Sequence, residues 1–180
     1  MSLPPFTSNG LLPPGDYPLT LDELRGSYLV TGEGLSVPGW DRVWRAHLVE
    51  NLEPFVRQLW QVGVERIVVN GSFVTSKPKP GDIDAYFECT LGTYSLTLVR
   101  LMQLEPPLPW DLAHRPIYRR SGEPKPVMWH RYRVEVFPHF SDYPNPTGIF
   151  DEHGQELELG ELFRREKFSL RAKGVVQIVR

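Results

Sequence analysis

The distribution of proline is the feature that most constrains how this chain can fold. Eighteen prolines occur among 180 residues, against an average usage of roughly 5%, and they gather at residues 4–18, 78–80, 106–126 and 138–146. Proline lacks the amide hydrogen that helices and inner strands use, and it disfavours helix at the residue before it. The four clusters therefore predict connections, and regular elements are expected between them.

Helices are predicted where apolar residues recur every three or four positions. The clearest pattern covers residues 41–62, where an interior Pro54 predicts a kink or a break. Its apolar positions are Val43, Trp44, Leu48, Leu52, Phe55, Val56 and Leu59, and the polar positions between them are Arg42, Arg45, Glu50 and Gln58. Further helices are predicted over residues 21–28, 93–103 (with Leu96, Val99 and Leu101 inside) and 160–173.

Strands are predicted from β-branched composition and from alternation of apolar and polar residues. Residues 65–70 form a short apolar run typical of a buried strand. Residues 82–88 and 128–137 alternate, and residues 175–179 are apolar enough for a last strand or a helix end. The length predicts a single domain over residues 20–180, with its core at about 41–137, preceded by an extended proline-rich arm over residues 1–19.

Composition excludes several classes of protein. Hydrophobic residues make up 41% and charged residues 23% of the chain, as in a folded domain. No apolar run approaches the roughly 20 residues that cross a bilayer, and residues 1–15 do not resemble a signal peptide, so no membrane association and a cytoplasmic location are expected. Cys89 is the only cysteine, which excludes an internal disulfide. The net charge of −2 argues against strong non-specific nucleic-acid binding, although it leaves room for a local basic pocket.

The segment from residue 70 to 88 carries the chemistry. Gly71 and Ser72 follow a predicted strand directly, and nine residues later Asp82 and Asp84 open the next one. Alternation places both aspartates on one face, with Cα atoms roughly 6.5 Å apart. Two carboxylates so close repel each other unless a cation lies between them, and hard oxygen ligands favour Mg2+ or Mn2+. Glu135, in another predicted strand, would supply a third carboxylate for a two-ion site.

This arrangement, G-S-x(9)-D-x-D after a short strand with a later acidic residue in an apolar strand, resembles the nucleotidyltransferase superfamily typified by DNA polymerase beta. More narrowly, LPPG at 12–15, GSFVTSKPKPGDID at 71–84 and FPHF at 137–140 resemble a family of small bacterial and phage proteins within it. The resemblance implies an α/β (α+β) fold, a small mixed sheet packed with helices. It also implies Asp82, Asp84 and Glu135 as ligands of magnesium, two ions being expected.

The resemblance also implies a nucleotide site. Gly71 and Ser72 would hold the β- and γ-phosphates of a nucleoside triphosphate such as ATP, and Glu135 would help to activate the acceptor hydroxyl. Lys77 and Lys79 lie in the following loop, where they would either meet the triphosphate or belong to a solvated turn. Arg133 shares the face of Glu135 in the predicted strand and is a further candidate phosphate ligand.

We therefore predict a magnesium-dependent nucleotidyltransferase. It would move a nucleoside monophosphate from a nucleoside triphosphate to a hydroxyl of a protein, an RNA end or a small molecule, with release of pyrophosphate. The resemblance also implies a setting, because some small members of the superfamily act in toxin–antitoxin or phage-defence systems. Gly81 stands where many members have serine, which keeps open a catalytically silent nucleotide-binding or partner-binding module. A two-metal nuclease is a weaker third alternative.

Overall fold

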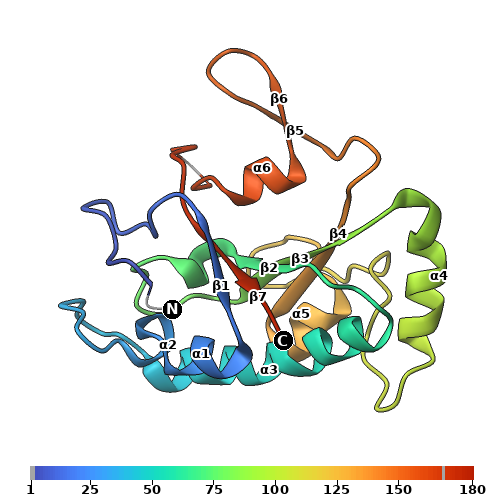
Figure 1. The fold of residues 1–180 in the computed structure, drawn as a ribbon, viewed down its shortest axis with the longest axis horizontal. Coiled ribbons are helices and arrows are strands. Elements are labelled where there is room, and N and C mark those ends of the chain that lie inside the picture. Colours follow the sequence, from blue (N-terminus) through green and yellow to red (C-terminus); the bar gives the residue numbers. More distant parts are fainter. Residues whose placement is uncertain (1–2, 168) are drawn as a thin grey trace.

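A five-stranded mixed sheet forms the centre of the fold in the computed structural model, which describes residues 3–167 and 169–180 (Figure 1). The strands in spatial order are β1 (Asp16–Leu19), β7 (Val175–Ile178), β2 (Ile67–Asn70), β3 (Ile83–Cys89) and β4 (Val134–Phe140). β1 runs parallel to β7 and β3 parallel to β4, whereas β2 is antiparallel to both of its neighbours. The predicted mixed sheet and α/β class are confirmed.

Helices cover one face of the sheet (Figure 1). This layer contains α1 (Leu21–Gly26), α2 (Tyr28–Thr31), α3 (Arg42–Gln61) and α5 (Val127–Tyr132), while α4 (Leu91–Met102) lies at its side. On the opposite face lie α6 (Leu159–Phe163) and a separate hairpin of β5 (Pro146–Phe150) and β6 (Glu156–Glu158). None of the helices in the described part of the chain is both long and apolar enough to cross a membrane.

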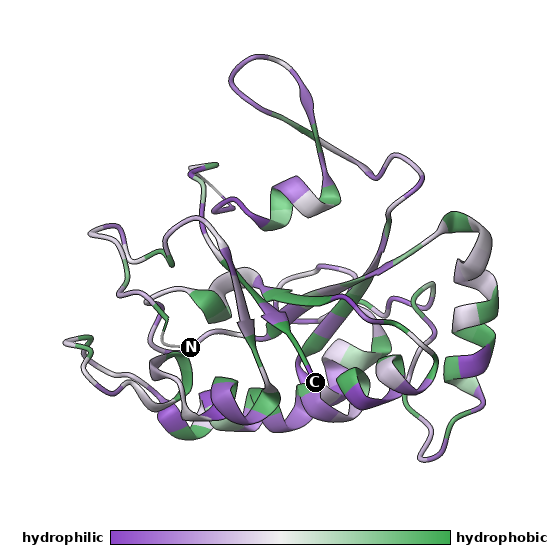
Figure 2. Ribbon diagram, viewed as in Figure 1, coloured by the Kyte–Doolittle hydropathy of each residue, from purple (hydrophilic) through white to green (hydrophobic). Residues whose placement is uncertain are grey.

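Side chains of successive strand residues lie on opposite faces of the sheet. Ile67 and Val69 of β2 join the main core beneath the helices, whereas Val68 between them joins a small cluster on the other face with Tyr86. Phe163 of α6 packs on that cluster. Figure 2 shows the apolar strands at the centre and hydrophilic colour along the outer side of α3. The face under α6 is thus only partly filled by apolar side chains, and it is the face to which Asp84 and Glu135 belong.

Helix α3 confirms the clearest prediction and corrects one detail of it. It is helical throughout Arg42–Gln61, so Pro54 does not break it. Arg45, expected among the polar positions, is fully buried. Its guanidinium donates to the carbonyls of Leu29, Phe73, Thr75 and Lys77 at 2.6–3.0 Å. Burial lowers the pKa of Arg45 to about 9. This arginine ties α3 to the loop that follows Gly71.

Several predicted boundaries were wrong. Residues 128–132 are helical, because α5 occupies Val127–Tyr132 and the chain turns through a left-handed Arg133, at φ 57°, before β4 begins. The helix predicted over 160–173 ends at Phe163, and the chain then folds back through a bridge between Arg165 and Ala172. The predicted arm also ends in a sheet strand, β1.

The remaining elements follow the sequence more closely. Helix α4 matches the prediction over 93–103 within two residues, but Leu96 and Val99 are exposed and only Leu101 is buried. The helix predicted over 21–28 divides into α1 and α2. Thr20 makes the expected capping box with Glu23 at the start of α1. Residues 175–178 form the last strand, one of the two predicted outcomes.

Candidate metal and nucleotide site

Three carboxylates meet at one end of the β3–β4 pair. In this parallel pair the Cα atom of Asp84 lies opposite that of Glu135, and Asp82 comes directly before β3. One oxygen from each of the three carboxylates lies within 4.8 Å of the other two. Sequence alternation predicted the shared face of the aspartates, and the strand register adds Glu135 to it. Three negative charges at such distances form an oxygen-only donor set suited to a hard divalent cation.

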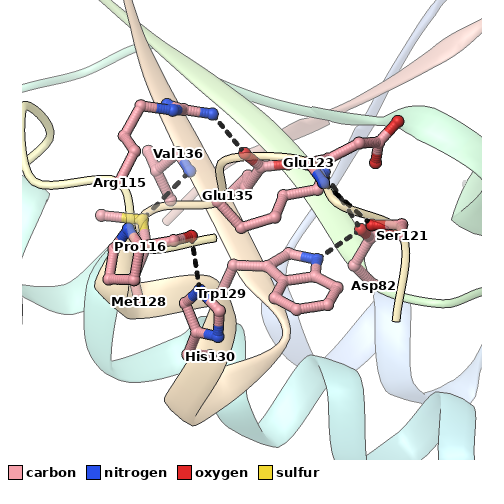
Figure 3. A network of polar contacts seen from close by, with 11 residues as sticks. Asp82, Arg115, Pro116, Ser121, Glu123, Met128, Trp129, His130, Glu135 and Val136 are labelled. Atoms are coloured by element: carbon pink, nitrogen blue, oxygen red, sulfur yellow. Dashed lines mark hydrogen bonds and ion pairs between the residues drawn. The ribbon is translucent and has the colours of Figure 1, made fainter. Parts of the chain in front are cut away.

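Asp82 is held by an indole. The Nε1 of Trp129 in α5 donates a hydrogen bond to Asp82 Oδ2 at 2.6 Å (Figure 3). The guanidinium of Arg133 stacks on the Trp129 ring in a cation–π contact, 4.0 Å from the ring centroid. Figure 3 also shows His130 of the same helix directed to the carbonyl of Pro116, at 3.1 Å. Helix α5, which the sequence pattern had assigned to a strand, therefore positions one carboxylate of the triad.

Two cations from the loop before α5 bind Glu135. Arg115 Nη2 lies 3.0 Å from Glu135 Oε1 (Figure 3), and Lys125 Nζ lies 2.6 Å from Oε2. The Glu135 side chain is only 4% exposed. Lys125 Nζ is also 4.0 Å from Asp82 Oδ2. Burial acts to lower the pKa of Lys125, but the contact with Glu135 and the charges of the nearby aspartates outweigh it and raise that pKa. Lys125 is therefore a firmly protonated part of the acidic cluster.

Asp84 is the least compensated carboxylate of the three. Among the described residues, no donor forms a hydrogen bond or an ion pair with its side chain. Burial, followed by the charges of Asp82 and Glu135, raises the pKa of Asp84 to about 7. A carboxylate that is desolvated and lacks a donor gains from any cation placed beside it. The buried Asp84 carboxylate without a donor is therefore the observation that makes this cluster of residues suitable for a metal ion.

Gly71 is required where the chain leaves β2. It has φ 72°, and a Cβ built on it would lie 1.9 Å from Asp84 Oδ2. Any other residue would therefore be strained and would displace the carboxylate. Gly71 begins a single 3-10 turn, η1 (Gly71–Val74), rather than a longer helix. Ser72 in that turn faces the same cleft as the acids.

The acidic triad lies in a cleft of about 1020 Å³ between the sheet and the C-terminal segment. The segment after α6 contributes four cationic residues to the lining, Arg165, Lys167, Arg171 and Lys173, together with the acidic Glu166. Lys173 is only 5% exposed. Its Nζ lies 3.0 Å from the carbonyl oxygen of Gly71 and 3.4 Å from Asn70 Oδ1. Burial lowers the pKa of Lys173 to about 8, although the charge of Asp84 partly opposes this.

The fold brings only some of the predicted phosphate ligands into the cleft. Gly71, Ser72 and Lys77 line the cleft with the triad. Lys79 is instead paired with Asp41, 2.8 Å away, and lies outside the cleft lining. Arg133 is stacked on Trp129 and does not line the cleft either, because the left-handed turn before β4 removes it from the strand pattern on which its prediction rested.

Comparison with known proteins gives a family and no activity. A family model matches residues 4–179, nearly the whole chain. The chain belongs to DUF6932, a family of unknown function. No curated protein and no solved structure gives a significant match.

In this DUF6932 chain, sequence reasoning missed the groups that surround the triad. Arg115 and Lys125 lie in a proline-rich connection, and Trp129 lay in a segment read as a strand. Lys173 fell in a predicted helix that ends ten residues earlier, at Phe163. The only signal for the three cations was the run of cationic residues in segments rich in proline and turns, which is also typical of a solvated surface.

Proposed function

We propose that this protein is a magnesium-dependent nucleotidyltransferase, which transfers a nucleoside monophosphate from a nucleoside triphosphate to a hydroxyl acceptor and releases pyrophosphate. The observation that carries the proposal is the meeting of Asp82, Asp84 and Glu135 beside the Gly71–Ser72 turn at the base of one cleft. Metal-assisted phosphoryl transfer needs clustered carboxylates to hold the metal and a nearby group that binds phosphate. The triad supports the first requirement, and the Gly71–Ser72 turn supports the second.

The aspartates are the proposed metal ligands. Asp82 is oriented by Trp129, and the Asp84 carboxylate, which has no hydrogen-bond donor in the described part of the chain, is directed at the Gly71 turn. A bound Mg2+ would supply a Lewis acid that draws charge from phosphate oxygens and favours deprotonation of the acceptor hydroxyl. The glycine leaves room for the carboxylate, so the turn and the metal ligand are parts of one site.

Polar and cationic residues of the cleft lining are proposed to hold the phosphates. Ser72 and Lys77 contribute from the loop after β2, and Arg165, Arg171 and Lys173 from the C-terminal segment. Cationic side chains in a partly closed cleft bind phosphate oxygens by charge-assisted hydrogen bonds. The proposal does not use Lys79 and Arg133, because both are engaged elsewhere.

A catalytically silent module of the same fold is the second candidate. One observation favours it: both oxygens of Glu135 already have a cationic partner in Arg115 and Lys125. A carboxylate whose two oxygens are both engaged by cations is less accessible to an attacking hydroxyl. Such a protein would bind a nucleotide, or a partner, without releasing pyrophosphate.

The test is transfer of label from each α-labelled nucleoside triphosphate, with Mg2+, into the RNA and protein of a cell extract. Wild type should transfer label, and Asp82→Asn/Asp84→Asn and Glu135→Gln should each lose it. Asp22→Asn serves as the control, because the Asp22 side chain is 94% exposed and does not line the cleft. Nucleotide binding without pyrophosphate release in any extract would favour the silent module, and undiminished transfer by the double variant would refute the proposed site.

A further inference from the structure

Lys125 occupies a position among the carboxylates that a bound cation would otherwise take. Its ammonium lies 2.6 Å from Glu135 Oε2 and 4.0 Å from Asp82 Oδ2. The Lys125 side chain is 21% exposed, so it lies inside the cleft rather than on its rim. Two ions that share a set of carboxylates in phosphoryl-transfer sites lie about 3.5–4 Å apart. The ammonium is thus within the space that a pair of ions would need.

The backbone holds Lys125 in this position from both sides. Its amide donates to the carbonyl of Pro116 at 3.0 Å, and a bridge between Ile117 and Pro124 closes the loop directly before it. The next residue, Pro126, is the N-cap of α5. The backbone of Lys125 is thus fixed between a closed loop and a helix start, and the ion pair with Glu135 holds its ammonium in the site.

Both oxygens of Glu135 already have a cationic partner, which makes Glu135 the least available of the three carboxylates for a second metal ion. Oε2 is taken by Lys125, and Oε1 by Arg115 at 3.0 Å. These two cations offset two of the three negative charges of the triad, and the remaining charge lies on the aspartate side, where the charge of Lys173 opposes it in part. Asp84 is the carboxylate without a donor among the described residues. The charge and the free oxygens therefore suit one divalent cation at the aspartates.

We propose that Lys125 stands in for the second divalent cation, so that Asp82 and Asp84 hold a single metal ion and Glu135 acts as a positioning residue for the lysine. This inference rests on the proposed function, and it changes that function from a two-ion to a one-ion site. In this arrangement Arg115 keeps Glu135 in place, and Glu135 keeps the Lys125 ammonium beside Asp82.

The experiment counts Mn2+ ions bound per chain by electron paramagnetic resonance, with Mn2+ alone and with a non-hydrolysable nucleoside triphosphate analogue. Wild type should bind one ion per chain under both conditions. Lys125→Met should bind two in the presence of the analogue, because it frees an oxygen of Glu135 and removes the competing charge. Lys79→Met, which removes a lysine that is paired with Asp41 and does not line the cleft, should still bind one.

Each outcome separates this inference from the proposed function. Two ions on wild type, or one on a folded Lys125→Met, would overturn the role of Lys125 and leave the metal site intact. No ion on any variant, with or without the analogue, would overturn the metal site and the inference with it. If Lys125→Met does not fold, Lys125→Gln replaces it, because its shorter, neutral side chain removes the charge beside Asp82 and releases Glu135 Oε2; it too should bind two ions, and one ion on it would refute the proposal.

Discussion

Replacing Asp84 by asparagine should make the protein more stable in the absence of divalent cations. Burial and the neighbouring carboxylates raise the pKa of Asp84 from 3.8 to about 7. The folded protein therefore favours the protonated acid. The contribution of this group to stability is fully present below about pH 4, and it is lost as the pH rises towards 7. At pH 8 the folded protein carries the whole cost of a poorly solvated, repelled carboxylate.

The magnitude follows from the shift. Three pKa units correspond to about 4 kcal/mol of unfolding free energy. Since the Asp84 side chain keeps some access to solvent, we expect a gain of about 2–4 kcal/mol at pH 8 from Asp84→Asn, and little or no gain near pH 4. Urea unfolding followed by tryptophan fluorescence, in the presence of a chelator, measures this difference at each pH.

An aspartate with the opposite environment provides the control. Backbone amides of Gln155 and His153 donate to Asp151 and lower the pKa of its carboxyl, so Asp151→Asn should reduce stability at neutral pH. Addition of Mg2+ should then stabilise wild type and not Asp84→Asn, because only the former keeps the charged ligand. A gain from Asp84→Asn that is equal at pH 4 and pH 8, or a loss at pH 8, would refute the reasoning.

Three further substitutions test the surroundings of the site. Gly71→Ala should abolish Mn2+ binding, since its Cβ would meet a carboxylate oxygen at 1.9 Å. Gly63→Ala is the control: Gly63 is also at positive φ but has no atom within 4 Å, so the change should cost only about 1 kcal/mol of stability and keep binding. Equal effects of the two variants on Mn2+ binding would contradict this account. Arg45→Met should lower the unfolding free energy by about 3–5 kcal/mol, because a buried guanidinium is lost from four carbonyls, while the exposed Arg42→Met should change it little in the same urea titration. Trp129→Phe should weaken Mn2+ binding by about tenfold through loss of the hydrogen bond to its aspartate, and unchanged affinity in a titration would show that the indole has no positioning role.

The sequence predicted elements whose signal is local and strong. Residues 41–62 repeat apolar side chains over several turns, and residues 65–70 and 82–88 alternate or run apolar between turn residues, so the helix and both strands were found. Residues 128–137 were misread because MWHRYRVEVF fits a strand period as well as a short helix. The left-handed conformation of Arg133, which tertiary contacts fix, is what separates the helix from the strand in this segment.

The acidic part of the candidate site was accessible from sequence, and its cationic part was not. Asp82 and Asp84 are two residues apart on one strand end, so their proximity follows from alternation alone. Lys125 and Lys173 reach the same cleft from positions 41 and 89 residues after Asp84. Their placement depends on how loops close over the sheet, and no local period encodes that.

Strand β7 lies between β1 and β2 although it is the last strand of the described chain to be synthesised. Until residues 175–178 have left the ribosome, β1 and β2 have an open gap between them, and Lys173, two residues before the strand, has no place beside Gly71. Pairing of such distant segments is slow to form because loop closure precedes the gain from contact. A nascent chain thus carries all three carboxylates without a closed cleft around them, which delays assembly of the proposed site until synthesis has passed β7.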